Sequence, residues 1–248
     1  MLNTDTGHFA AEGYCLFPGV FHPDEVSAMQ HSLAVASRAG FLDRDQYYGE
    51  PHTKEVFWLD VCTHRRLLDA VESVLGPNLI LVYSSMFIKM PRDGMSVAWH
   101  QDNNYWPSVH GTDVATVWLA LDDVDAGNAA MSIIPGSHQG YREMATVPSD
   151  ETETLRKKVL VTPEMEASAV MMEMKAGSIS IHDSYILHGS QANDSDRRRA
   201  GYTIRYCSTD TAWVDMDEHS IPVFLVRGEA GSRGEGYTDL RPIAAPAR

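Results

Sequence analysis

Hydrophobic and polar positions follow a helical period in the first 77 residues. Apolar side chains recur at roughly helical spacing after Pro23, and again between Thr63 and Gly76. Proline is tolerated in the first helical turn, threonine is a common N-cap, and glycine often ends a helix. A short apolar run at residues 13–17 predicts a strand before the first helix. We therefore expect residues 1–77 to form a helical support region.

Beyond residue 77 the pattern changes to short apolar runs bounded by Gly, Pro, Asp or Asn. Many such runs at fairly even spacing are typical of an antiparallel sandwich or barrel. The predicted strands cover residues 79–83, 86–90, 115–121, 131–134, 178–181 and 202–206. We expect a mainly β fold with flanking helices.

The chain shows no internal repeat and no flexible linker, so we expect a single domain over residues 1–248. The predicted β core spans residues 78–208. Residues 142–174 are polar and weakly periodic, and are expected to form a long excursion from that core. Residues 209–248 are expected to form a tail that packs on it.

The composition is that of an ordinary globular protein, with 44% hydrophobic and 22% charged residues. Lys and Arg number 20 and Asp and Glu 34, so the formal net charge is −14. The basic run at residues 197–199 is too short for a phosphate-binding surface, and we expect no nucleic-acid partner.

Membrane insertion and export are not expected either. No apolar run reaches the roughly 18 residues of a membrane span, and the first five residues do not resemble a signal peptide. The three cysteines are widely spaced, which argues against a disulfide framework. A reducing cytoplasm is the expected location.

Candidate chemistry begins with a histidine and an aspartate two positions apart, His100 and Asp102. On an extended strand such residues face the same side, so both could reach one ion. His188, after another strand-like run, is the candidate third ligand. Two histidines and one carboxylate form the facial triad of non-haem iron(II) oxygenases, which leaves positions open for oxygen and a cosubstrate. An isolated H-x-D pair is common by chance, so the triad needs further support.

Arg199 lies eleven residues after His188, and a returning antiparallel strand could turn it into the same barrel mouth. Its planar guanidinium suits a carboxylate. His182 and Asp183 are adjacent, so their side chains point to opposite faces of a strand. We interpret this second pair as structural, with Asp183 near a turn.

Taken in order, these segments resemble the phytanoyl-CoA dioxygenase family of iron(II)- and 2-oxoglutarate-dependent oxygenases. The likeness extends from residues 13–14 to about residue 206. Its motifs are residues 99–102 (Trp-His-Gln-Asp), 117–124, 134–138 (Ile-Pro-Gly-Ser-His), 187–190 (Leu-His-Gly-Ser) and 199–206. The resemblance implies a double-stranded β-helix, the jelly-roll (cupin-like) core of that family, in agreement with the strand pattern.

The resemblance also assigns roles. It implies that Fe(II) binds His100, Asp102 and His188, that O2 is the oxidant, and that 2-oxoglutarate is the cosubstrate. Arg199 matches the residue that pairs with the distal carboxylate of 2-oxoglutarate. The other residues matching the cosubstrate site are Ser190, Gln101, Trp118 and Met86.

Family members that halogenate have a small residue in place of the carboxylate ligand. Because Asp102 is present, the resemblance implies hydroxylation, or a related oxidation of an unactivated C–H bond, with release of succinate and CO2. The expected substrate is a small metabolite or natural-product intermediate. Tyr105 and Trp213 are candidate substrate contacts, because pockets favour aromatic residues.

Two other readings of the same residues stay open. Zinc or manganese on the triad could activate water in a cupin-type hydrolase or isomerase. Alternatively, the jelly roll could be a non-catalytic small-molecule binding protein. The oligomeric state does not follow from the sequence.

Overall fold

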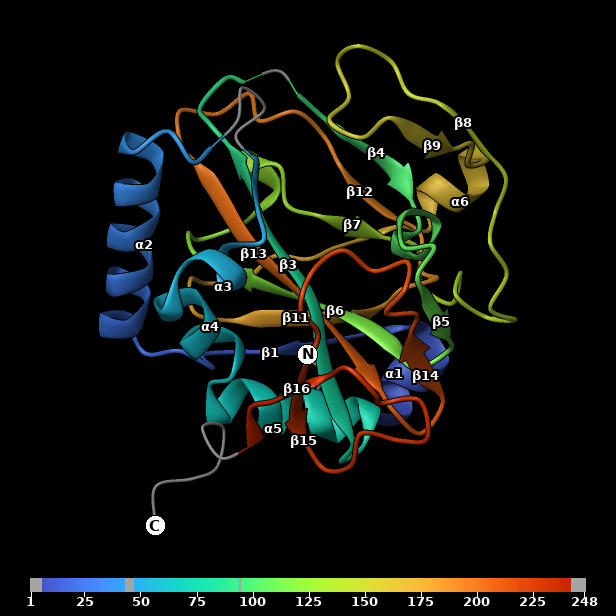
Figure 1. Cartoon of the computed structure of the whole chain (residues 1–248). Helices are drawn as coiled ribbons and strands as arrows, with labels where there is room; N and C mark the ends of the chain where they lie inside the picture. The colour runs from blue at the N-terminus through green and yellow to red at the C-terminus, as the bar shows by residue number, and fades with distance from the viewer. Residues whose placement is uncertain (1–5, 43–46, 94, 242–248) are drawn as a thin grey trace.

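The computed structural model describes residues 6–42, 47–93 and 95–241 (Figure 1). Residues 1–5, to which the signal-peptide prediction refers, lie outside the described residues. In the described part of the chain, no helix is both long enough and apolar enough to cross a membrane.

The main sheet joins strands from the N-terminal region, the centre and the C-terminal tail. Its pairings are antiparallel except between the last two strands, and β2 (Tyr47–Gly49) pairs with β3 outside the main order. Along the sheet the order is β1 (Tyr14–Phe17), β11 (Ile179–Asp183), β6 (Val114–Ala120), β13 (Arg199–Ser208), β3 (Leu79–Lys89), β15 (Phe224–Arg227) and β16 (Thr238–Asp239).

A second, smaller sheet carries two of the candidate ligands. Its order is β10 (Val170–Met171), β7 (Ser132–Ile133), β12 (His188–Ser190) and β4 (Val97–His100). β12 and β4 are antiparallel, and His188 lies opposite His100 in register. Two further pairs are β5 (Val109–Gly111) with β14 (Ala212–Val214), and β8 (Thr146–Pro148) with β9 (Lys157–Val159).

Most of the helices lie together beside the main sheet, on the left of Figure 1. Buried side chains of α2, α4 and α5 join those of the sheet in one core cluster. This burial supplies the main hydrophobic stabilisation of the fold. The helices are α1 (Thr6–Glu12), α2 (Pro23–Arg38), α3 (Pro51–Lys54), α4 (Val56–Cys62), α5 (Arg65–Leu75) and α6 (Pro163–Ala167), with short 3-10 turns η1 (Asp102–Tyr105) and η2 (Ala126–Asn128).

The expected mainly β jelly roll is confirmed, with two local corrections. Residues 79–83 and 86–90 are not two strands, because β3 runs without a break through Ser84 and Ser85. The N-cap of α5 is His64, not Thr63 as the sequence suggested. The Thr63 hydroxyl instead donates to the Leu59 carbonyl oxygen and closes α4.

The polar excursion at residues 142–174 contains β8, β9, α6 and β10. It is anchored at Ser96, which forms an isolated bridge with Glu153 just before β4. The tail contributes β15 and β16 to the main sheet. Both segments are therefore integral parts of the β framework.

Candidate active site

A cavity of about 660 Å³ is lined by residues of both sheets and of the connecting loops. Its volume lies within the range of small-molecule binding sites. Thr116 and Trp118 of β6 line it from the main sheet, and His100 and His188 from the smaller sheet. Residues 154–156 of the excursion also line it, so this segment forms part of the wall.

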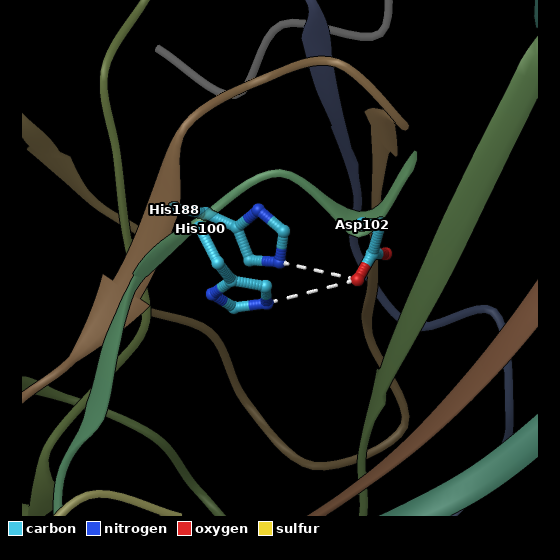
Figure 2. Close-up of side chains that lie close together, drawn as sticks. All are labelled: His100, Asp102 and His188. Atoms are coloured by element: carbon cyan, nitrogen blue, oxygen red, sulfur yellow. Dashed lines mark ion pairs between the residues drawn. The ribbon is translucent and has the colours of Figure 1, made fainter. Parts of the chain in front are cut away.

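The three predicted ligands converge in this cavity (Figure 2). His100 ends β4, Asp102 opens η1 and His188 opens β12. Asp102 Oδ1 lies 3.7 Å from His100 Nε2 and 3.8 Å from His188 Nε2. Two ligand atoms each about 2.1 Å from one ion can lie up to ~4.2 Å apart. The donor atoms of the triad therefore fit a single metal ion.

The backbone orients both imidazole rings toward that point. His100 Nδ1 lies 2.8 Å from the carbonyl oxygen of Ala98, and His188 Nδ1 lies 3.1 Å from that of Ile186. A carbonyl oxygen only accepts, so each Nδ1 carries a proton and Nε2 is the ring nitrogen that faces the other ligands. Burial, followed by the neighbouring His100 and His182, lowers the pKa of His188 well below its usual value. A neutral imidazole is the form that binds a metal.

The carboxylate of Asp102 is held at its other oxygen. The Thr116 hydroxyl donates to Oδ2 over 2.5 Å, and His182 Nε2 lies 3.6 Å from the same atom. Burial alone would raise the pKa of Asp102, but the His100 and His182 contacts lower it well below its usual range. The group is therefore a carboxylate at neutral pH, with Oδ1 directed toward the histidines (Figure 2).

Arg199 faces the same cavity from the start of β13. Its Nη2 donates to the Ser190 hydroxyl over 3.0 Å, and its guanidinium carbon lies 5.4 Å from the Trp118 ring centroid. Its Nε is buried and has no hydrogen-bond partner in residues 6–42, 47–93 and 95–241. Burial lowers the pKa of Arg199 to about 10, which leaves it charged at neutral pH. A buried cation with a spare donor suits an anionic ligand.

Gly201 allows Trp118 to lie against β13. A Cβ at Gly201 would come within 2.1 Å of Trp118 Cζ2. A side chain there cannot coexist with this position of the indole, so the glycine makes room for one wall of the cavity.

Two of the expected cosubstrate residues point elsewhere. The Gln101 amide donates to the carbonyl oxygens of Tyr185 and Arg142 and accepts from the Met144 N–H, so it ties the excursion to the metal loop. Met86 is fully buried in the core cluster shared with the helices. Neither is among the residues that line the cavity. For Met86 the reason is strand parity, because its neighbours in β3 face the cavity instead.

Of the two candidate substrate residues, one lines the cavity and the other does not. Tyr105 lines the cavity, and its hydroxyl donates to the Lys157 carbonyl oxygen over 2.5 Å. Trp213 does not line it. The Trp213 ring stacks on His110 of β5, with a centroid distance of 4.3 Å, and Arg233 lies over it.

Thr116, His182 and Arg205 are among the cavity residues that the sequence analysis did not assign to the site. His182 is not merely structural, since it lies beside Asp102 while Asp183 accepts the Tyr185 N–H at a turn. Strand parity offered a signal for Arg205. It lies six positions after Arg199 on one strand, and therefore on the same face.

The comparison with protein families agrees with this geometry. The family model described as phytanoyl-CoA dioxygenase (PhyH) matches residues 9–201. The chain belongs to the phytanoyl-CoA dioxygenase family. The match covers the triad, Ser190 and Arg199, and the resemblance inferred from the motifs is confirmed.

Individual members of the phytanoyl-CoA dioxygenase family are distant. The human peroxisomal phytanoyl-CoA dioxygenase is 25% identical over 167 residues, covering 66% of this chain and 49% of that protein. The ectoine dioxygenase of Halomonas elongata is 24% identical over 235 residues, covering 84% and 70%. A solved structure described as the non-heme monooxygenase ThoJ superposes with a TM-score of 0.77 at 26% identity, covering 96% and 88%. The chain spans about half the length of the phytanoyl-CoA dioxygenases it matches.

Proposed function

We propose that this protein is a non-haem iron(II)- and 2-oxoglutarate-dependent dioxygenase. It hydroxylates, or otherwise oxidises, an unactivated C–H bond of a small-molecule metabolite or natural-product intermediate, with release of succinate and CO2. The observation that carries the proposal is the pairing of a buried His-Asp-His cluster with a buried arginine in one cavity.

The donor set favours ferrous iron. Two imidazoles and one carboxylate oxygen would hold ferrous iron as a facial triad, a ligand set that leaves positions for a cosubstrate and oxygen. With Oδ2 engaged by Thr116, Asp102 offers a single oxygen, Oδ1, to the metal. His100 and His188 complete the set. When bound, iron and 2-oxoglutarate would together supply the oxidising power drawn from O2.

Arg199 and Ser190 would hold the distal carboxylate of 2-oxoglutarate. The Ser190 hydroxyl already accepts from Arg199 and can donate to a carboxylate oxygen. Trp118 walls the cavity beside this pair. Because all three side chains are nearly excluded from solvent, their interaction with the anion is weakly screened.

Asp102 also bears on the type of reaction. A carboxylate at this position occupies the coordination site that halogenating members leave for chloride. The Thr116 hydroxyl and the His182 imidazole hold that carboxylate in place. The proposed outcome is therefore oxygen insertion or a related C–H oxidation, not halogenation.

The two alternatives fit less of the cavity. A zinc or manganese hydrolase would use the triad but would leave the buried, unpaired Arg199 without a role. A non-catalytic binding protein would have no need for two imidazoles whose Nδ1 contacts direct Nε2 toward the same carboxylate. The charge of the chain and the wide spacing of its three buried cysteines support an additional proposal, a cytoplasmic protein without nucleic-acid partners.

The test uses the full chain loaded with Fe(II) without oxygen. Adding 2-oxoglutarate should produce the weak visible charge-transfer band of the iron complex, and admitting air should release succinate. Arg199→Gln should weaken 2-oxoglutarate binding at least about tenfold, the equivalent of 1.4 kcal/mol. Arg198→Gln is the matched control, because that neighbouring arginine pairs with Asp122 outside the cavity. Absence of both the band and succinate would reject the proposal.

A further inference from the structure

Arg205 is a second buried arginine on the face of β13 that carries Arg199. The two arginines are 6% and 2% exposed, and both line the cavity. Other arginines pair with carboxylates, as Arg198 does with Asp122 and Arg227 does with Asp69. In the described part of the chain, no carboxylate lies within ion-pair distance of Arg205.

The hydrogen bonds of Arg205 use one end of its guanidinium. Nη1 donates to the hydroxyls of Ser85 and Thr203 and to the Thr203 carbonyl oxygen. These neutral acceptors fix the group without neutralising its charge. Nε is buried and, within the part of the chain that the structure describes, has no hydrogen-bond partner. The Nε edge therefore remains available to an acceptor from outside the protein.

Arg199 shows the same set of features. It too is buried and bonded to a hydroxyl, and among the described residues it has no carboxylate partner and its Nε has no hydrogen-bond partner. Each guanidinium also lies 5.4 Å from the centre of an aromatic ring: Trp118 for Arg199, and both Tyr83 and Trp106 for Arg205. Burying a charge without a partner costs free energy, and an anionic ligand would offset that cost at both arginines.

The two arginines are connected to different ligands of the triad. Ser190, bonded to Arg199, is two residues from His188. Arg205 pairs in register with Thr116, whose hydroxyl holds Asp102. Arg205 is six positions after Arg199, which places the two residues ~20 Å apart along β13. A ligand reaching from Arg205 toward the triad would therefore not compete with one held by Arg199.

We propose that Arg205 binds a carboxylate of the substrate, so that the enzyme oxidises a small organic acid. Ser85 and Thr203 hold the guanidinium, and Tyr83 and Trp106 flank it. This inference rests on the proposed function, since it assumes that Arg199 is reserved for 2-oxoglutarate. Glu50 and Glu218 also line the cavity and disfavour a second negative charge on the substrate.

The probe is acetate, the smallest carboxylate that keeps the planar oxygen pair, and acetamide is its neutral counterpart. The ¹⁵N-labelled protein is loaded with diamagnetic Zn(II) and saturated with 2-oxoglutarate, which occupies Arg199. The Nε–H resonance of Arg205 is identified by its disappearance in Arg205→Lys. Acetate should shift it saturably, with half-saturation in the range of ~1–10 mM, and acetamide should not.

A second measurement compares Arg205→Gln with Arg156→Gln, an exposed arginine of the same cavity wall. Acetate should raise the Tm of the wild type and of Arg156→Gln but not of Arg205→Gln. If Arg205→Gln does not fold, Arg205→Lys replaces it, with acetate affinity at least about tenfold weaker.

Two results would overturn the inference: no saturable shift of the Arg205 resonance up to ~100 mM acetate, or equal shifts with acetamide. Failure of 2-oxoglutarate to stabilise the metal-loaded protein would count against the proposed function instead. The acetate response reports on Arg205 itself, so the two failures are distinguishable.

Discussion

Replacing Thr116 with valine removes one hydroxyl from the support of the metal site. The Thr116 hydroxyl donates to Asp102 Oδ2 over 2.5 Å, and both side chains are buried. Valine keeps the β-branched shape, so the substitution leaves the strand and the packing nearly unchanged. His182 Nε2, at 3.6 Å, is too far to replace the lost hydrogen bond without moving.

The expected loss follows from the charge of the acceptor. A hydrogen bond to a charged group contributes about 1.5–3 kcal/mol, and each 1.4 kcal/mol changes an equilibrium constant tenfold. With Oδ2 freed, the carboxylate can rotate and Oδ1 loses its fixed direction toward His100 and His188. We expect Thr116→Val to weaken Fe(II) binding about 10–100-fold, the usual effect of losing a residue that supports a metal ligand.

The assay is an anaerobic titration of the metal-free protein with Fe(II) in competition with a chelator of known affinity. Thr63→Val is the matched control, because its hydroxyl bonds to the Leu59 carbonyl oxygen in the helical layer. That control should lower the stability of the protein and leave its metal affinity unchanged. A Thr116→Val protein that binds Fe(II) within a factor of two of wild type would refute the reasoning.

Three further predictions concern the cavity wall, a buried carboxyl group and the metal. Gly201→Ala should displace Trp118, destabilise the protein by about 1–3 kcal/mol, and weaken 2-oxoglutarate binding, as measured by denaturant unfolding and ligand titration. Burial raises the pKa of Asp183 to about 7, above its unfolded value, so the folded state keeps a proton that the unfolded state releases. The free energy of unfolding should therefore fall as pH rises from 4 to 7. The free energy of unfolding of Asp183→Asn, relative to that of wild type, should be roughly 2–4 kcal/mol higher at pH 8 than at pH 5. An equal difference at both pH values would contradict this. Removing the metal with a chelator should lower the Tm, because a ligand at 100 times its Kd adds about 2.7 kcal/mol; an unchanged Tm would argue against a bound metal.

The sequence by itself identified the core of the site. The two-residue spacing of His100 and Asp102 places both on one side of an extended strand, a rule that depends only on local backbone geometry. The strand pattern then suggested His188 and Arg199, and the family resemblance added Ser190. Helix and strand positions were largely predictable for the same reason, since hydrophobic period is a local property.

Local patterns misplaced side chains where parity or packing was unknown. Met86 and Gln101 neighbour cavity residues in sequence, yet one faces the helical core and the other binds the excursion. Trp213 is an aromatic in a loop-rich tail, but its partner is His110 of a neighbouring strand. Composition alone does not tell which of two environments such a residue occupies.

Only the tertiary structure decided what surrounds the triad. Strand register places Thr116 beside both His182 and Arg205, although these residues are far apart along the chain. Register between distant strands depends on the packing of the whole core and leaves no mark in any one segment. The support of Asp102 and the second buried arginine are therefore properties of the assembled sheet.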